Sequence, residues 1–195
     1  MLGLSRRCPR APQTLYWAFR GDPLFTRVFR EKSRVLSFFE AIGELLREGA
    51  LLSVCVQEKG VTVAVAVLSF AFRWTRVSRR ALWLLARSLG PRGLLEVAGW
   101  LGQSLRYWAA TRGLENYCHL LFLASAVRRR GYGSLALSAA EKACGRIGGV
   151  GIVLDVDAEN PALLLYYRRG YRPLGEAFFS GRRYIVMAKL LRPEA

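Results

Sequence analysis

The sequence has few of the residues that build metal sites or disulfide frameworks. It contains one histidine and four cysteines, which are scattered and form no C-x-x-C pair: Cys8, Cys55, Cys118 and Cys144. Structural zinc sites need closely spaced Cys and His ligands, and disulfide-rich domains concentrate cysteines in a short chain. The spacing therefore predicts no metal site, no disulfide framework and a protein of the reducing cytoplasm.

Long apolar runs are also lacking. The longest spans Val61 to Phe72 and is closed by Arg73, which makes it too short to cross a bilayer. The N-terminal residues MLGLSRRCPR are basic, but no apolar stretch of the kind that a signal peptide needs follows them. We therefore expect no membrane span and no secretory signal.

Acidic residues are scarce. The chain of 195 residues has 14 of them against 30 basic residues, of which 26 are Arg, so the net charge is +16. Such an excess favours an anionic partner such as nucleic acid, anionic lipid or a phosphorylated cofactor, although a general preference for Arg would produce it too. With 52% hydrophobic and 23% charged residues, the composition is that of one globular domain over residues 1–195.

Hydrophobic periodicity predicts the order of the elements. Helical spacing covers Ala11 to Gly49, with a break at 21–23, and Arg79 to Arg112, with a break at 90–93. Two β-branched runs between these regions, Leu51–Val56 and Val61–Phe70, predict a hairpin. The remaining segments alternate between strand and helix: Tyr117–Ala124, Leu135–Ile147, Ile152–Val156, a helix from Asn160 and Pro161 to Gly170, and Tyr184–Leu190. This order predicts a mixed α/β domain.

The most informative segment is Arg128-Arg129-Arg130-Gly131-Tyr132-Gly133-Ser134, between a predicted strand and a predicted helix. Glycines let the backbone approach a ligand closely, and the helix start offers unpaired N–H groups to an anion. Arginines beside it add phosphate donors. The segment therefore predicts a diphosphate site, with an exposed turn and solvated arginines as the alternative.

The same segment begins like an RNA-binding strand motif. Arg130 to Leu137 lacks the aromatic residues that this motif carries at its fifth and eighth positions, where they stack on bases. The residues that follow are helix formers. We therefore do not expect a nucleic-acid partner.

Two motifs together resemble a known family. Arg128-x-x-Gly131-x-Gly133 matches the R/Q-x-x-G-x-G/A motif of the GNAT superfamily of N-acetyltransferases. The segment from Asn160 to Tyr171 is similar to the superfamily's N-x-x-A-x-x-L-Y-x-x-x-G-F/Y, with Leu163 at the small-residue position. More weakly, residues 18–23 (AFRGDP) resemble the A-F-x-x-D-P of puromycin-acetyltransferase-like members, as does the helical insertion before the Tyr117 strand.

This resemblance implies the GNAT fold: a mixed, mostly antiparallel central sheet that splays at the cofactor strand, flanked by helices. Residues 11–112 would form the acceptor side, with the insertion, and residues 117–190 the acetyl-CoA-binding half. The first strand would be short or missing before Ala11. No metal is implied, and a homodimer is left open.

The resemblance also implies which residues bind acetyl-CoA. The backbone of Leu121, Phe122 and Leu123 would pair with the pantetheine arm on a bulged strand. N–H groups from Arg129 to Ser134 would hold the pyrophosphate, with Arg128 and Arg130 as charge partners. The residues assigned to acetyl-CoA are Leu121, Phe122, Leu123, Arg128, Arg129, Arg130, Gly131, Tyr132, Gly133, Ser134 and Asn160.

Two residues are candidates for proton transfer. Tyr166 would sit near the sulfur, and a phenol with a reference pKa of about 10 can donate to a thiolate whose conjugate acid lies near ~8.5; the alternative is helix packing. His119 lies on the same strand face as Tyr117 and could accept the amine proton, unless it is a core histidine. Glu115 and Glu58 are rival bases.

The function indicated is acetylation of a primary amine of a small molecule or peptide, by direct transfer in a ternary complex. Acetylation of a protein N-terminus or Lys, a non-catalytic acetyl-CoA-binding module and a basic nucleic-acid binder are the alternatives. Aromatic residues could wall the acceptor pocket or pack in the core: Trp74, Trp83, Trp100, Tyr107 and Trp108.

Overall fold

The structure is a computed structural model that describes residues 2–5, 8–29, 31–70, 77–91, 93, 111, 113–114, 116–127, 130–179 and 181–191. These residues form a seven-stranded sheet with the order β1-β2-β3-β4-β5-β7-β6. The strands are β1 (Leu2–Ser5), β2 (Leu52–Glu58), β3 (Val61–Ser69), β4 (Tyr117–Ser125), β5 (Gly151–Asp157), β6 (Arg172–Phe179) and β7 (Arg182–Leu190). Neighbouring strands are antiparallel except β4 and β5, which are parallel.

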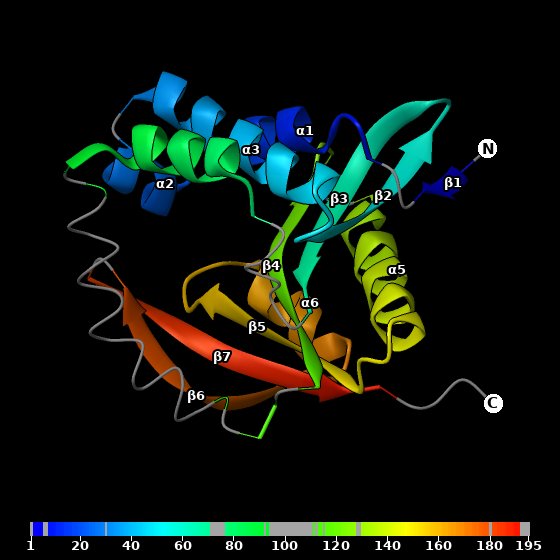
Figure 1. The fold of residues 1–195 in the computed structure, drawn as a ribbon. Helices are drawn as coiled ribbons and strands as arrows, with labels where there is room; N and C mark the ends of the chain where they lie inside the picture. The colour runs from blue at the N-terminus through cyan, green and yellow to red at the C-terminus, as the bar shows by residue number, and fades with distance from the viewer. Residues whose placement is uncertain are drawn as a thin grey trace.

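Helices cover both faces of this sheet (Figure 1). One face carries α1 (Ala11–Phe19), α2 (Pro23–Phe29), α3 (Lys32–Arg47) and the helical residues 79–91. The other face carries α5 (Tyr132–Arg146) and α6 (Ala162–Arg168). The predicted fold class, a mostly antiparallel mixed sheet flanked by helices, is confirmed.

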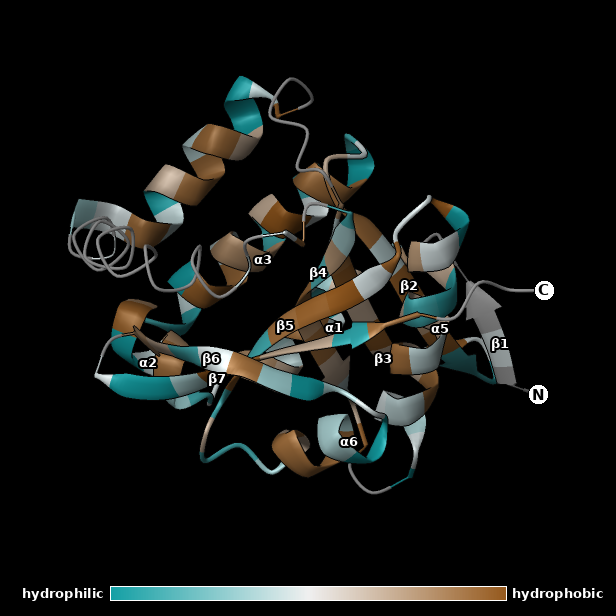
Figure 2. Ribbon diagram, turned by 90° about the horizontal axis from the view of Figure 1, so that it is seen from below, coloured by the Kyte–Doolittle hydropathy of each residue, from teal (hydrophilic) through white to brown (hydrophobic). Residues whose placement is uncertain are grey.

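The sequence places apolar residues where these layers meet. In α3 the side chains of Val35, Phe39 and Ile42 are buried at three- and four-residue spacing, which gives the helix one apolar face. Seven consecutive residues of β3 are buried because helices cover both of its faces. Figure 2 shows β3, β4 and β5 as largely apolar, whereas β6 and β7 are mixed. Among the described residues, no helix is both long and apolar enough to cross a membrane.

The structure differs from the predicted elements at β6 and at the start of the last helix, whereas the first strand is short, as expected. β6 was not predicted because Pro173 and Gly175 disfavour strands, but this edge strand pairs only with β7, and an edge strand tolerates Pro. The last helix begins at Ala162 with Pro161 as its N-cap, one residue later than predicted. Of the predicted helical region 79–112, most residues after 91 lie outside the described part of the chain.

Two disulfides contradict the prediction that the cysteines form no framework. Cys8 is bonded to Cys55, and Cys118 of β4 is bonded to Cys144 of α5. All four cysteines are buried. The pairs are distant in sequence and meet only through the fold, because β1 runs beside β2 and α5 packs on β4.

We expect the unfolded but unreduced protein to take up no thiol label, and the reduced protein to take up four. The two links span 47 and 26 residues, so each should stabilise the fold by about 3–4 kcal/mol through loss of chain entropy in the unfolded state. Mass spectrometry after alkylation in denaturant, with and without reductant, checks the pairing. Labelling of all four cysteines without reductant would contradict it.

Candidate active site

The site is built where β4 and β5 separate. The parallel register joins Tyr117–Leu120 to Gly151–Leu154 and ends there, although β4 continues to Ser125 and β5 to Asp157. On the other side of β4, the register with β3 skips from Leu120 to Phe122, so Leu121 is an extra, bulged residue. The predicted bulge and splay of this strand are both present. Backbone groups of Leu121–Leu123 that face away from β3 are therefore not paired with β5.

The start of α5 lies just beyond the end of β4. Gly131 is the N-cap of α5 with φ of 77°, a left-handed conformation that favours glycine. The N–H of Leu135 donates to the carbonyl of Gly131 at 3.1 Å, which closes the first turn. The N–H groups of the residues before it have no acceptor within the helix, as at every helix start. This turn can therefore present several N–H donors to an anion.

The side chain of Tyr132 fixes this turn to the sheet. The residue is largely buried; its hydroxyl donates to Glu58 Oε2 of β2 at 2.6 Å, and this hydrogen bond raises the pKa of Tyr132. Tyr132 is thus bound inward, and only its backbone is available to a ligand. Arg130 is exposed beside the turn, and the predicted partners Arg128 and Arg129 lie outside the described residues.

Tyr166 projects from α6 into the core on the α5 side of the sheet. Its ring meets that of Tyr171 edge to face, with centroids 5.6 Å apart. Burial, and to a smaller degree the charge of Asp155, raises the pKa of Tyr166 above its ordinary value. Its hydroxyl therefore keeps its proton and can act as a donor at neutral pH.

Asn160 has a structural role at the start of α6. Its Oδ1 accepts the N–H of Ala162 at 2.9 Å, and its carbonyl accepts the N–H of Leu163 at 2.9 Å. Asn160 also stands one residue closer to Tyr166 than the Asn of the family segment does. Its side-chain oxygen is thus engaged in capping the helix.

His119 forms a pair that the sequence did not predict. Its Nε2 lies 2.9 Å from Oδ1 of Asp155, the first residue of β5 beyond the paired stretch. The side chains are 26% and 41% exposed, so solvent or a ligand can reach both. The only sequence signal for Asp155 was a carboxylate inside an otherwise apolar strand. Of the rival bases, Glu58 is bonded to Tyr132, and Glu115 lies outside the described residues.

A pocket of about 280 Å³ opens beside this pair. It is lined by four side chains of α2, by Phe38, Leu89 and Phe122, by Asp155 and by residues of β6 and β7. Helices α2 and α3 and Leu89 of the helical residues 79–91 thus contribute to this pocket. Phenylalanines form the aromatic walls, whereas Trp83 is exposed on the surface. Trp74, Trp100, Tyr107 and Trp108 lie outside the described residues.

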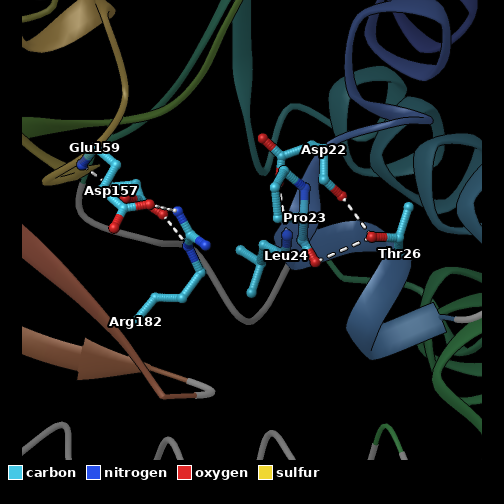
Figure 3. A network of polar contacts seen from close by, with 7 residues as sticks. All are labelled: Asp22, Pro23, Leu24, Thr26, Asp157, Glu159 and Arg182. Atoms are coloured by element: carbon cyan, nitrogen blue, oxygen red, sulfur yellow. Dashed lines mark hydrogen bonds and ion pairs between the residues drawn. The ribbon is translucent and has the colours of Figure 1, made fainter.

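The charges of Asp22, Asp155 and Asp157 all act on Tyr184 of the pocket wall, although the chain as a whole is strongly basic. Figure 3 shows Arg182 between the carboxylates of Asp157 and Glu159, with Nη2 2.8 Å from Glu159 Oε2. Burial of Asp157 favours its neutral form, but hydrogen bonds from Arg182 and from the N–H of Glu159, with the charge of Arg182, lower its pKa. On the facing side, Asp22 accepts the N–H of Leu24 at 2.9 Å and starts α2.

Within the described part of the chain, no three His, Cys, Asp or Glu side chains gather in a way that could hold a metal ion. What the site offers is hydrogen-bond donors at a helix start, a buried phenol, and an imidazole–carboxylate pair beside an apolar pocket. Such a set suits acid–base chemistry on an acyl donor that carries phosphates.

Comparisons with known proteins agree with this arrangement. The sequence model of the acetyltransferase (GNAT) family matches residues 14–171. No curated protein sequence matches the chain significantly.

Several solved structures have a similar fold. A putative GNAT-family acetyltransferase from Desulfovibrio desulfuricans is 14% identical, with a TM-score of 0.62 over 98% of this chain and 100% of that chain. The ribosomal-protein-S18-alanine N-acetyltransferase from Escherichia coli is 14% identical, with a TM-score of 0.54 over 100% and 97%. The PaiA N-acetyltransferase from Thermoplasma acidophilum, solved in complex with coenzyme A, is 13% identical, with a TM-score of 0.55 over 97% and 99%.

Proposed function

Because the chain belongs to the acetyltransferase (GNAT) family, we propose that it transfers the acetyl group of acetyl-CoA to a primary amine, directly within a ternary complex. The observation that carries this proposal is the conjunction of three features at one place. β4 bulges at Leu121, β4 separates from β5 after Leu120, and α5 begins at the left-handed Gly131. Together they present strand backbone and helix N–H groups along one path.

This path suits a long, phosphorylated substrate. In our proposal the backbone of Leu121–Leu123 pairs with the pantetheine arm, and the N–H groups of the first turn of α5 bind the pyrophosphate. Arg130, together with Arg128 and Arg129, adds positive charge. Asn160 contributes by holding the start of α6, and this helix carries Tyr166. Residues 117–190 thus supply the acetyl-CoA side, and residues 11–112 supply most of the acceptor side.

Two side chains are proposed to move protons. Bound acetyl-CoA would supply an activated acyl group. Tyr166 gives its hydroxyl proton to the leaving sulfur, and His119 accepts the proton that the amine nitrogen loses as the N–C bond forms. When the His119 proton is on Nε2, that atom donates to Asp155, and Nδ1 carries the lone pair that accepts. Asp155 is therefore proposed to orient His119.

Two glycines at opposite ends of α5 provide a matched test. Gly131 and Gly148 have φ of 77° and 86°, and an added Cβ would meet nothing within 4 Å at either position. Alanine at either site should cost about 1–2 kcal/mol of stability, because L-residues disfavour this conformation. We expect only Gly131→Ala to raise the KM for acetyl-CoA, by about tenfold, which corresponds to ~1.4 kcal/mol of lost binding.

Released CoA can be followed with a thiol reagent, and acetyl-CoA binding by the rise in melting temperature. Because the four cysteines are paired, the folded protein should give little thiol background. If both variants weaken acetyl-CoA binding equally, the effect comes from the fold and not from the proposed site. A protein that binds acetyl-CoA but acetylates no amine would favour the non-catalytic alternative.

A further inference from the structure

The pocket beside His119 has walls made almost entirely of carbon. The rings of Phe25, Phe29, Phe38 and Phe122 pack on one another, with centroid distances of 5.8 Å, 5.8 Å and 6.2 Å for Phe25–Phe29, Phe25–Phe38 and Phe38–Phe122. A volume of about 280 Å³ lies at the small end of ligand pockets and suits one ring or one branched chain. A strongly hydrated group would lose its hydrogen bonds to water there.

Among the described residues that line this pocket, Asp155 is the only charged one. The whole sequence has only three aspartates, Asp22, Asp155 and Asp157. The negative charge of each one acts on the hydroxyl of Tyr184. Asp157 is bonded to Arg182. In contrast, Asp155 has no Lys or Arg partner among the described residues, and it contacts His119. A local negative charge thus faces an apolar space in a protein of net charge +16.

The position of Asp155 connects this pocket to the proposed reaction centre. Asp155 follows directly after Leu154, the last residue of β5 that pairs with β4. Phe122 follows directly after the bulge of β4. The charge of Asp155 acts on Tyr166 on one side and on Tyr184 in the pocket wall on the other. A cation held by Asp155 would therefore stand between the apolar walls and the proposed acid.

We propose that the acceptor is a primary amine carried on an aromatic or branched apolar group, which sits among the phenylalanines while its ammonium binds the carboxylate of Asp155. The ammonium loses one proton to solvent before its nitrogen attacks the acetyl group, and His119 accepts the second. This inference rests on the proposed acetyl transfer, because it places the nitrogen where His119 and Tyr166 can act. A free amine and the first residue of a peptide, such as an N-terminal Phe, share this chemistry.

A panel of small probes tests the proposal. Phenethylamine has both features, ethanolamine has the amine alone, and 3-phenylpropionate has the ring with the opposite charge. We expect the kcat/KM of phenethylamine to exceed that of ethanolamine by about 10²-fold, since each buried methylene contributes about fourfold. By calorimetry with CoA present, 3-phenylpropionate should not bind detectably. Peptides Phe-Ala-Ala and Gly-Ala-Ala, both amidated at the C-terminus, distinguish the two sources of the amine.

The charge is tested by Asp155→Asn, which keeps the size of a half-exposed side chain. We expect the affinity for phenethylamine to fall about 10- to 100-fold, the usual value of a hydrogen bond to a charged group. Glu176→Gln is the matched control, because it removes the same charge from an exposed residue of β6 that pairs with Arg183 outside the pocket. Its affinity for phenethylamine should be unchanged.

The outcomes separate this inference from the proposed function. Equal kcat/KM values for ethanolamine, phenethylamine and both peptides would overturn the inference and leave acetyl transfer standing. Tight binding of 3-phenylpropionate, or equal effects of Asp155→Asn and Glu176→Gln, would also overturn it. Binding of phenethylamine that depends on Asp155, without any acetylation, would support the pocket and contradict the proposed function. Transfer to Phe-Ala-Ala but not to phenethylamine would support the inference with a peptide as the source.

Discussion

Replacing Tyr166 by phenylalanine should lower the turnover number of acetyl transfer by about 10²- to 10³-fold. The substitution removes the proposed proton donor but keeps the ring that packs against Tyr171. Because burial raises the pKa of Tyr166, the hydroxyl should give its proton to the leaving sulfur less readily than an ordinary phenol would. We therefore expect an effect below the upper limit for a general acid. The KM for acetyl-CoA should change little, and steady-state kinetics measures both quantities.

Tyr171→Phe is the matched control for this variant. Tyr171 is a buried tyrosine on the same side of the sheet, next to Tyr166, and has no proposed part in the reaction. Its loss of a hydroxyl should affect stability and leave the turnover number near that of the parent. If Tyr166→Phe is as active as the parent, Tyr166 is a packing residue and the acid must be sought elsewhere.

His119→Ala should lower kcat/KM for the amine by about 10²-fold or more, because it removes the proposed base. The side chain is partly exposed beside the pocket, so added imidazole can enter the space it leaves. We expect imidazole to restore part of the activity of His119→Ala and to leave the parent unaffected.

A merely structural role for His119 predicts a different result. In that case the variant would lose stability, and imidazole would not restore activity. Comparing urea unfolding of the two proteins separates these possibilities. An unchanged KM for acetyl-CoA would locate the effect on the acceptor side.

Features encoded by neighbouring residues were predicted well from the sequence. The spacing of apolar residues in 32–47 predicted α3, and the glycines at 131 and 133 predicted a turn that leads into α5. A few neighbouring residues are enough to predict each of these features, because one turn of helix or one tight turn determines it. The family motifs extended these local patterns to a complete fold class.

Features that depend on pairing between distant segments were missed. The sequence alone did not indicate that Cys8 meets Cys55, that β6 forms an edge strand, or that Asp155 meets His119. The last contact joins residues 36 positions apart, and it exists because β4 and β5 run in parallel and then separate. Similarly, the phenylalanines of α2 and α3 have the pattern of ordinary core residues, and only the packing of the helices over β4 leaves a pocket between them.

Leu121 also determines the phase of β4. Successive residues of a strand face opposite sides, yet Leu120 and Leu123, an odd number of positions apart, both pack on the α5 side. Phe122 and Ala124 pack on the side of α1–α3. If the same residues continued in regular alternation through Leu121 without a bulge, the ring of Phe122 would turn toward α5, and Leu123 would take its place at the pocket. Deletion of Leu121 would therefore regularise the strand and leave Phe122 on the pocket side, because Leu120 and Phe122 already pair with consecutive residues of β3.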